Sequence, residues 1–339
     1  MAQDNVKKII AKVNKDLGVG TVKRLGDDRT YLDVKIIPTG SLTLDMILLV
    51  GGLPRGRTVE LFGPEASGKT TVALHAIAEA QKQGHVAAFV DAEHALDKNL
   101  AIAYGVDMEN LIINQPDTGE QALDVVEALA KAGVAVVAVD SVAALLPEAE
   151  AESQMGDQHM GLHGRLMSKA LRKITKACYQ NDCTVIFINQ LREKIGGYGN
   201  PETTPGGRAL KFYASIRIDV RRGDLIRQNN EIIGHRMKLK AVKNKVAVPY
   251  KQGEVDLIYG VGFNRINEIA ELAMTAGILA RAGAYYRYTD KAGKDHQWMG
   301  KDSTKEALAE NETLMEEIAD KLLNPSPDVA EGLDAELEE

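Results

Sequence analysis

The spacing of apolar residues divides the chain into stretches with different periods. Between residues 59 and 188, short apolar runs rich in β-branched residues alternate with longer amphipathic stretches. This alternation is typical of a parallel sheet that carries helices on both faces. The predicted strands are Val59–Phe62, Val86–Val90, Leu111–Ile113, Val134–Val139 and Thr184–Ile188, and the predicted helices are Thr70–Gln83, Gly119–Ala132 and His163–Gln180.

Between Ala214 and Lys251 the period changes to two. In Ile216–Val220 and Met237–Ala241, aliphatic and charged residues alternate, so that the charges lie on one face of each strand. Because no helical stretch separates these strands, we expect them to extend the sheet in an antiparallel arrangement.

The two ends of the chain predict separate parts. Residues 3–17 have apolar positions at helical spacing, and the polar residues 18–29 are typical of a linker. After Asn264 we expect a smaller α+β unit, with helices at Ile266–Ala276 and Thr304–Leu323 and a strand at Tyr285–Tyr288. The predicted architecture is an N-terminal helix arm (1–30), an α/β core with a mostly parallel central sheet and an antiparallel extension (31–264), a small C-terminal α+β domain (265–325) and an acidic disordered tail (326–339).

Charge is distributed unevenly along the chain. The formal net charge is −7, yet residues 206–251 hold 12 Lys and Arg against three acids, and residues 328–339 hold six acids and no base. This pattern favours a protein whose basic segment binds a polyanion and whose acidic tail competes with that polyanion. A solvated basic face and a solubilising tail would give the same pattern. The polar N-terminus and the short apolar runs predict a cytoplasmic protein with no membrane partner, and we expect Cys178 and Cys183 to be free thiols.

The most specific motif is a complete G-x-x-x-x-G-K-[ST] loop between a predicted strand and a predicted helix. Backbone N–H groups of such a loop and the helix N-terminus hold a polyphosphate. We expect Lys69 to reach the β- and γ-phosphates of a nucleoside triphosphate and Thr70 to bind Mg²⁺. The candidate nucleotide-binding residues of the loop are Gly63, Pro64, Glu65, Ala66, Ser67, Gly68, Lys69, Thr70 and Thr71.

Polar side chains end three more of the predicted strands. Asp140 is a candidate to support Mg²⁺, and Glu93 is the candidate that orients the attacking water. Gln190 could contact the γ-phosphate without adding negative charge. The long glycine-rich stretch 192–208 follows Gln190 directly, and loops of this length are commonly functional. We expect its order to depend on the nucleotide state.

Together these residues resemble the bacterial RecA recombinase family over nearly the whole chain. The resemblance implies a DNA-dependent ATPase that forms ATP-bound helical filaments on single-stranded DNA. It also implies homologous pairing and strand exchange in recombination and repair, and a co-protease role toward a self-cleaving repressor. Beyond the phosphate-binding loop, the segments that carry the resemblance are 91–97 (DAEHALD), 115–123 (QPDTGEQAL), 139–145 (VDSVAAL), 156–162, 189–190, 199–204, 206–207, 209–215 and 242–245 (VKNK).

The resemblance implies ATP and Mg²⁺ as cofactors. By it, Glu93 activates the hydrolytic water and Gln190 couples the γ-phosphate to DNA binding. Lys243 and Lys245 match a pair that reaches a neighbouring subunit's ATP. Further positions of the nucleotide site are Asp97, Asp140 and Tyr259.

For DNA, the resemblance implies two loops, 150–162 and 194–208, as the primary site for single-stranded DNA. A secondary site and the C-terminal domain take double-stranded DNA. The N-terminal helix is expected to dock on the next subunit, and a head-to-tail contact that does not close gives a helical filament. The expected strand-contacting residues are Met160, Arg165, Arg172, Lys194, Ile195, Gly206, Gly207 and Arg208, and those of the secondary site are Arg221, Arg222, Lys238 and Lys240.

Three features depart from the family pattern. The second DNA loop is one residue shorter and carries Gly197-Tyr198 where the family usually has a bulkier run ending in Phe. Leu100 stands where a tyrosine usually stacks on adenine, with Tyr104 one turn later as the alternative, and Arg208 is a charge where Asn is common.

Three other functions share the phosphate-binding loop. A hexameric helicase or motor would not need the lysine pair together with both loops, and a small-molecule kinase would need an acceptor pocket. A non-hydrolytic DNA-coating protein would be expected to lose Glu93.

Overall fold

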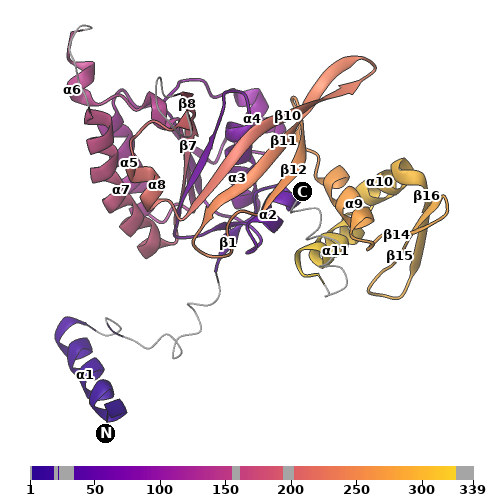
Figure 1. Ribbon diagram of the computed structural model, residues 1–339, viewed down its shortest axis with the longest axis horizontal. Coiled ribbons are helices and arrows are strands. Elements are labelled where there is room, and N and C mark those ends of the chain that lie inside the picture. The colour runs from indigo at the N-terminus through magenta and orange to yellow at the C-terminus, as the bar shows by residue number, and fades with distance from the viewer. Residues whose placement is uncertain (1, 19–21, 23–33, 155–160, 194–201, 326–339) are drawn as a thin grey trace. The chain divides into compact units, whose positions relative to one another are not determined.

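The computed structural model describes residues 2–18, 22, 34–154, 161–193 and 202–325, which form two units (Figure 1). The first unit, Met1–Lys35, contains the predicted N-terminal helix α1 (Ala2–Leu17). Its side chains Val6 and Ile9 are exposed. Most of the predicted linker lies outside the described residues.

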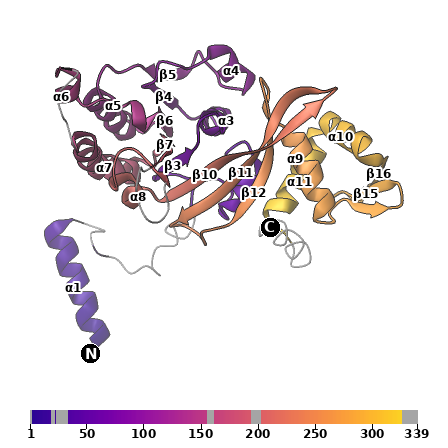
Figure 2. The same ribbon diagram turned by 45° about the horizontal axis from the view of Figure 1, so that its top comes forward.

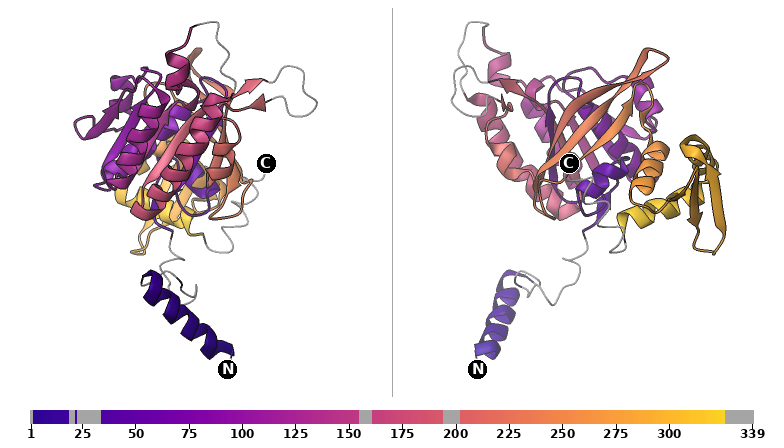
Figure 3. Two further views of the ribbon diagram at one scale, coloured as in Figure 1. Left: turned by 90° about the vertical axis from the view of Figure 1, so that its left-hand side faces the viewer. Right: turned by 45° about the vertical axis from the view of Figure 1, so that its right-hand side comes forward.

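A nine-stranded sheet forms the centre of the second unit, Ile36–Glu339, in the order β13-β12-β11-β10-β3-β7-β6-β4-β5. All pairs from β10 to β5 are parallel, and the pairs from β10 to β13 are antiparallel, which confirms the predicted mixed sheet. The strands β10 and β11 form a long hairpin (Figure 3). The strands are β3 (Thr58–Gly63), β4 (Ala87–Asp91), β5 (Leu111–Asn114), β6 (Val136–Asp140), β7 (Thr184–Gln190), β10 (Ile216–Gln228), β11 (Glu231–Asn244), β12 (Gln252–Ile258) and β13 (Gly262–Phe263).

Helices cover both faces of this sheet, as the apolar pattern predicted (Figure 2). One buried cluster combines α3 (Lys69–Lys82) with side chains such as Phe89 and Ile186. The other combines α5 (Gly119–Lys131) and α7 (Leu162–Asn181) with the neighbouring strand residues, such as Val90 and Phe187. Alternate residues of one strand therefore enter different cores. Cys178 and Cys183 are buried and free, as expected.

The C-terminal part contains three helices and a three-stranded antiparallel sheet. The prediction of one helix over Thr304–Leu323 was wrong, because the helix is broken at Asn311. The Asn311 side chain accepts a hydrogen bond from Leu314 N at 3.1 Å and so begins a new helix there. The elements are α9 (Arg265–Thr275), β14 (Ala280–Ala282), β15 (Tyr285–Thr289), β16 (Asp295–Met299), α10 (Gly300–Glu310) and α11 (Glu312–Leu323).

A buried carboxylate joins this part to the core. Glu268 of α9 accepts hydrogen bonds from Ser41 Oγ, Leu42 N and Thr43 N, at 2.7, 3.0 and 2.7 Å, at the start of α2 (Leu42–Ile47). Among the described residues no helix is long and apolar enough to cross a lipid bilayer. Short elements that the apolar pattern did not predict are β1 (Ile36–Ile37), α2, β2 (Leu53–Pro54), α4 (Lys98–Ala103), a 3-10 turn (Val142–Ala144), α6 (Glu148–Ala151), β8 (Arg192–Glu193), β9 (Glu202–Thr203) and α8 (Ala209–Tyr213).

Candidate nucleotide site and DNA-binding surfaces

The phosphate-binding loop connects β3 to α3 and packs tightly on the hairpin. A Cβ atom at Gly63 would lie 2.0 Å from Val220 O, and one at Gly68 would lie 3.0 Å from Met237 Cε. Gly68 also has a φ of +94°, a conformation that favours glycine. Both glycines of the motif are therefore required by geometry at these positions.

Lys69 is folded against its own loop. Its Nζ donates to Pro64 O at 2.5 Å and to Ser67 Oγ at 3.4 Å. Burial lowers the pKa of Lys69, whereas the nearby carboxylates of Asp140, Glu93 and Glu65 oppose this shift. The lysine therefore lies among the acids that the sequence predicted to share its site.

The strand ends bring the predicted catalytic residues together. Thr70 Oγ1 donates to Asp140 Oδ2 at 2.6 Å, so that the first turn of α3 meets the end of β6. Gln190 Nε2 donates to Glu93 Oε1 at 3.1 Å, and the Ser141 hydroxyl also donates to this oxygen. Burial raises the pKa of Asp140 to about 6, although the hydrogen bond from Thr70 lowers this pKa.

Asp91 organises the turn that carries Glu93. Its carboxylate is buried and accepts hydrogen bonds from Ala95 N, Leu96 N and Gln115 Nε2, at 3.0, 3.3 and 3.0 Å. Sequence reasoning left this residue without a role. A carboxylate directly after a buried strand and before a turn was the available signal, since such side chains commonly bond local backbone groups.

The donor set at Thr70 and Asp140 fits Mg²⁺, which prefers oxygen ligands and is commonly held by one or two protein groups together with phosphates and water. The described residues contain no group of three or more His, Cys, Asp or Glu side chains that could hold a metal by themselves. A metal ion at this place would therefore take its remaining ligands from phosphate and water.

The residues predicted near the nucleotide base differ in accessibility. Asp97 caps α4, and its Oδ1 accepts from Asn99 N and Leu100 N at 2.8 and 3.1 Å. Tyr104 cannot replace the missing tyrosine, because it is buried and stacked on His75 at a centroid distance of 5.0 Å. Tyr259 is 47% exposed and thus open to a ligand.

The predicted lysine pair lies at the C-terminal end of α8. Lys243 Nζ donates to Lys211 O and Phe212 O at 2.7 and 3.1 Å, and Lys245 Nζ donates to Phe212 O at 3.2 Å. The carbonyl end of a helix attracts cations. Burial, with the charges of Lys245 and Arg217, lowers the pKa of Lys243 to about 8.

A buried polar network adjoins Gln190 and was missed by sequence reasoning. Glu60, with no exposed surface, accepts from Arg217 Nε at 2.5 Å and from Asn189 Nδ2 at 3.0 Å. Asn189 Nδ2 also donates to Pro205 O at 3.3 Å. The strand that ends in Gln190 is therefore tied to the second predicted DNA loop. A glutamate inside an otherwise apolar strand was the signal for such a network.

The described residues of the predicted primary DNA site lie on α7 and directly before α8. Arg165 and Arg172 are exposed and two helical turns apart, hence on one face of α7. Gly206 and Gly207 have φ values of +83° and +71°, and Arg208 is exposed. Met160, Lys194 and Ile195 lie outside the described residues.

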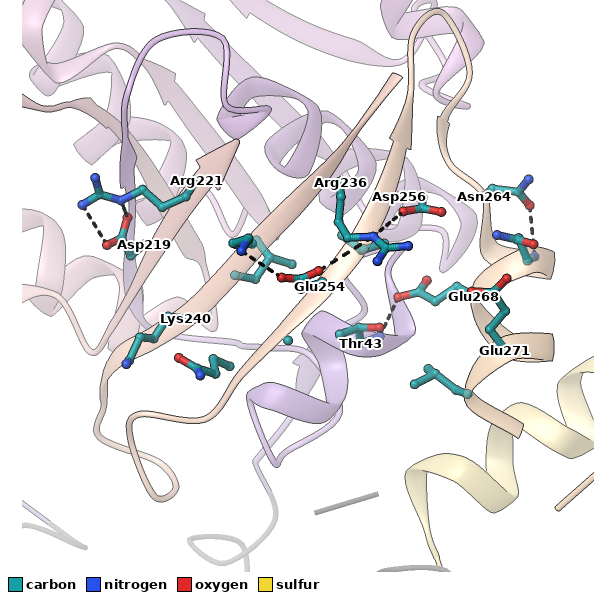
Figure 4. A pocket seen from close by; sticks show the side chains of 17 residues that line it. Thr43, Asp219, Arg221, Arg236, Lys240, Glu254, Asp256, Asn264, Glu268 and Glu271 are labelled. Carbon is teal, nitrogen blue, oxygen red and sulfur yellow. Dashed lines mark hydrogen bonds and ion pairs between the residues drawn. The ribbon is translucent and has the colours of Figure 1, made fainter. Parts of the chain in front are cut away.

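The four residues predicted for the secondary site lie on two faces of the hairpin. Arg221, Lys238 and Lys240 line one pocket of about 620 Å³ (Figure 4). Arg222 pairs in register with the buried Met237 and therefore faces the opposite side, where its Nη2 donates to Tyr259 Oη at 3.3 Å. The four residues predicted for the secondary site therefore do not all share one face of the hairpin.

Carboxylates partly neutralise the cations of this pocket. Arg221 pairs with Asp219 and Lys238 with Glu254, at 2.7 and 3.3 Å. Arg221 also donates two parallel hydrogen bonds to Glu202, at 2.7 and 2.6 Å. Because Glu202 belongs to the second predicted DNA loop, this pair joins the two predicted DNA surfaces.

A glycine loop between a strand and a helix, with acids and an amide at the adjoining strand ends, defines a P-loop ATPase. Residues 4–264 match the RecA N-terminal domain and residues 267–325 match the RecA C-terminal domain. The chain belongs to the RecA family, and it is therefore a DNA-dependent ATPase that pairs homologous DNA and exchanges strands.

Curated relatives agree over nearly the full length. The chain is 52% identical to Protein RecA of Clostridium novyi, over 92% of this chain and 89% of the relative. It is 51% identical to that of Citrifermentans bemidjiense, over 95% and 94%. It is 52% identical to that of Staphylococcus carnosus, over 94% and 89%.

Proposed function

We propose that Glu93 orients the water that attacks ATP at the phosphate-binding loop. We also propose that Gln190 contacts the γ-phosphate and thereby couples ATP binding to the predicted DNA loop that follows it in the chain. The hydrogen bond between Gln190 Nε2 and Glu93 Oε1, 3.1 Å long, is the observation that carries this proposal. A γ-phosphate that attracts the Gln190 amide would release the Glu93 carboxylate for water. Gln190 would then move the segment that follows it.

The remaining residues supply binding and charge. Lys69 and the loop N–H groups hold the phosphates, and Thr70 with Asp140 would hold Mg²⁺, which when bound neutralises phosphate charge. Lys243 and Lys245 would come from the neighbouring subunit of a filament and stabilise the transition-state charge. In the free subunit, both lysines donate to backbone carbonyls of α8, so a filament contact has to draw them away.

Single-stranded DNA is proposed to bind around Arg165, Arg172 and residues 206–208, and duplex DNA at the pocket of Arg221, Lys238 and Lys240 and at the C-terminal domain. Residues 1–30 would dock on the next subunit, residues 31–264 would form the ATPase core, and the tail 326–339 would compete with DNA. A cytoplasmic location and a self-cleaving repressor as a partner are proposed on the family membership alone.

Steady-state ATP hydrolysis without DNA, with single-stranded DNA and with duplex DNA tests the proposal. We expect strong stimulation by the single strand and a lag on duplex. Lys69→Ala is the control that should hydrolyse nothing. A rate of ATP hydrolysis that is the same with and without DNA would overturn the proposed coupling. It would favour a helicase-like or kinase-like function of the phosphate-binding loop.

A further inference from the structure

Ser141 is a buried residue that directly follows strand β6 and has no exposed surface. Backbone hydrogen bonds hold the chain on both sides of it. Asp140 O accepts from Ala92 N and Glu93 N, at 2.8 and 3.2 Å, and Ser141 O accepts from Ala144 N at 3.0 Å. These bonds fix the place of Ser141 relative to the turn that carries Glu93.

The hydroxyl of Ser141 does not serve the turn that this residue begins. Ser141 is the N-cap residue of the 3-10 turn Val142–Ala144. A serine at the N-cap of a helix commonly accepts a hydrogen bond from a backbone N–H of that helix. Here the side chain makes no capping bond, and the hydroxyl donates to Glu93 Oε1 instead. Local capping therefore does not account for this serine.

The carboxylate of Glu93 is placed by two donors. Glu93 is exposed, and a glutamate on a surface turn has much rotamer freedom to lose when it is held in one place. The Ser141 hydroxyl and Gln190 Nε2 both donate to Oε1, the latter at 3.1 Å. Oε2 takes no part in these two bonds, so it can accept a hydrogen bond from the attacking water.

We propose that Ser141 is the positioning residue that holds Glu93 during hydrolysis. The inference rests on the proposed function, which assigns Glu93 to the water and Gln190 to the γ-phosphate. A Gln190 amide that has moved to the γ-phosphate no longer donates to Glu93. Ser141 is buried and fixed by its backbone, so its hydroxyl stays at Oε1. An ionised carboxylate only accepts hydrogen bonds, and the serine therefore orients Glu93 without replacing it at the water.

The variant Ser141→Ala of the full-length protein tests this role in steady-state ATP hydrolysis on saturating poly(dT). We expect kcat to fall about tenfold, the lower end for the loss of a hydrogen bond to a charged group. The KM for ATP should not change, because the bond acts on the water and not on the binding of ATP. Affinity for poly(dT) with a non-hydrolysable ATP analogue should also equal that of the wild type.

A double-mutant cycle with Glu93→Gln separates positioning from packing. In the Glu93→Gln background no carboxylate is left to hold, so adding Ser141→Ala should change kcat by a factor of about one. A tenfold loss in that background as well would overturn the inference, since the serine would then act through another group.

Ser41→Ala is the matched control. Ser41 is also a buried N-cap residue whose hydroxyl donates to a glutamate, Glu268, at 2.7 Å, but this pair lies between α2 and α9. The control should keep the wild-type kcat.

The outcomes distinguish this inference from the proposed function. A wild-type kcat in Ser141→Ala, or a loss that appears in KM and not in kcat, would overturn the inference while slow turnover of Glu93→Gln still supports Glu93. Rapid turnover of Glu93→Gln refutes the proposed function instead.

Discussion

Replacement of Glu202 by glutamine should release Arg221 for DNA. In the structure, Arg221 donates to both oxygens of Glu202 and, at 2.7 and 3.1 Å, to both oxygens of Asp219. These bonds raise the pKa of Arg221 above its ordinary range and place one guanidinium between two negative charges. These four bonds use four of the five N–H groups of the guanidinium, so a DNA phosphate that binds Arg221 through two N–H groups has to displace a carboxylate. Glu202→Gln keeps the shape of the side chain and removes one of the two charges.

The size of the effect follows from exposure and from counterion release. The side chains of Arg221 and Glu202 are 34% and 33% exposed. Water therefore screens the pair, and the change in free energy of DNA binding is at most about 1 kcal/mol, or about fivefold in affinity. One additional phosphate contact steepens the dependence of log K on log salt by about 0.9. Between 50 and 200 mM salt, the variant should therefore lose about 3.5-fold more affinity than the wild type.

The assay is fluorescence anisotropy of a labelled second strand added to filaments that already hold an unlabelled first strand, at several salt concentrations. Binding of the first strand is measured separately, because Glu202 also belongs to the second predicted DNA loop. Glu271→Gln is the matched control, since Glu271 lines the same pocket but pairs with Lys305 at 2.9 Å. A salt dependence equal to that of the wild type would show that Arg221 does not contact DNA phosphate.

Three further predictions concern other parts of the chain. Glu93→Gln should bind ATP and single-stranded DNA but lower the kcat of hydrolysis by about 100-fold or more, and rapid turnover would contradict its role with water. Burial lowers the pKa of His75 to about 4 from 6.5, so the unfolded state takes up the proton first on acidification. Between pH 7.5 and 4.5 the free energy of unfolding of the wild type should fall by about 2.5 kcal/mol relative to that of His75→Phe. If the difference in free energy of unfolding between the two proteins, measured in urea, does not change with pH, this prediction is refuted. Glu268→Ala leaves the buried donors of Ser41, Leu42 and Thr43 unpaired, so it should lower the free energy of unfolding by about 2–4 kcal/mol in the same assay. An unchanged unfolding midpoint would show that these hydrogen bonds between α9 and the start of α2 do not stabilise the fold.

The sequence predicted those features that depend on local geometry. The phosphate-binding loop needs a strand before it and a helix after it, and β3 and α3 begin and end within one residue of the predicted strand and helix. Asp140, Glu93 and Gln190 follow buried strands of one parallel sheet, so they had to lie at the same edge. Their contacts with Thr70 and with each other follow from that topology.

The features that the sequence did not predict are of two kinds. Some depend on contacts between distant segments, and others had a local sequence signal that was not used. Arg221 and Arg222 are adjacent in a strand, and a period of two alone places them on opposite faces, but the resemblance grouped them together. The pairing of Arg221 with Glu202 joins segments 19 residues apart in the chain, and no local pattern predicts it. The break at Asn311 did have a local signal, because asparagine commonly begins a helix.

The order of strands places the nucleotide site between the two predicted DNA surfaces. The strand β3, which carries the phosphate-binding loop, lies between β7 and β10 in the sheet. Gly63 at its end is in register with Gln190 of β7, after which the second predicted DNA loop begins. On the other side, Phe62 is in register with Asp219 of β10, two residues before Arg221. The two predicted DNA surfaces therefore begin one strand away from the phosphate-binding loop, on opposite sides of it. Since a Cβ at Gly63 would lie only 2.0 Å from Val220 O, the loop and β10 have no free space between them, and a shift of the loop must move β10 as well.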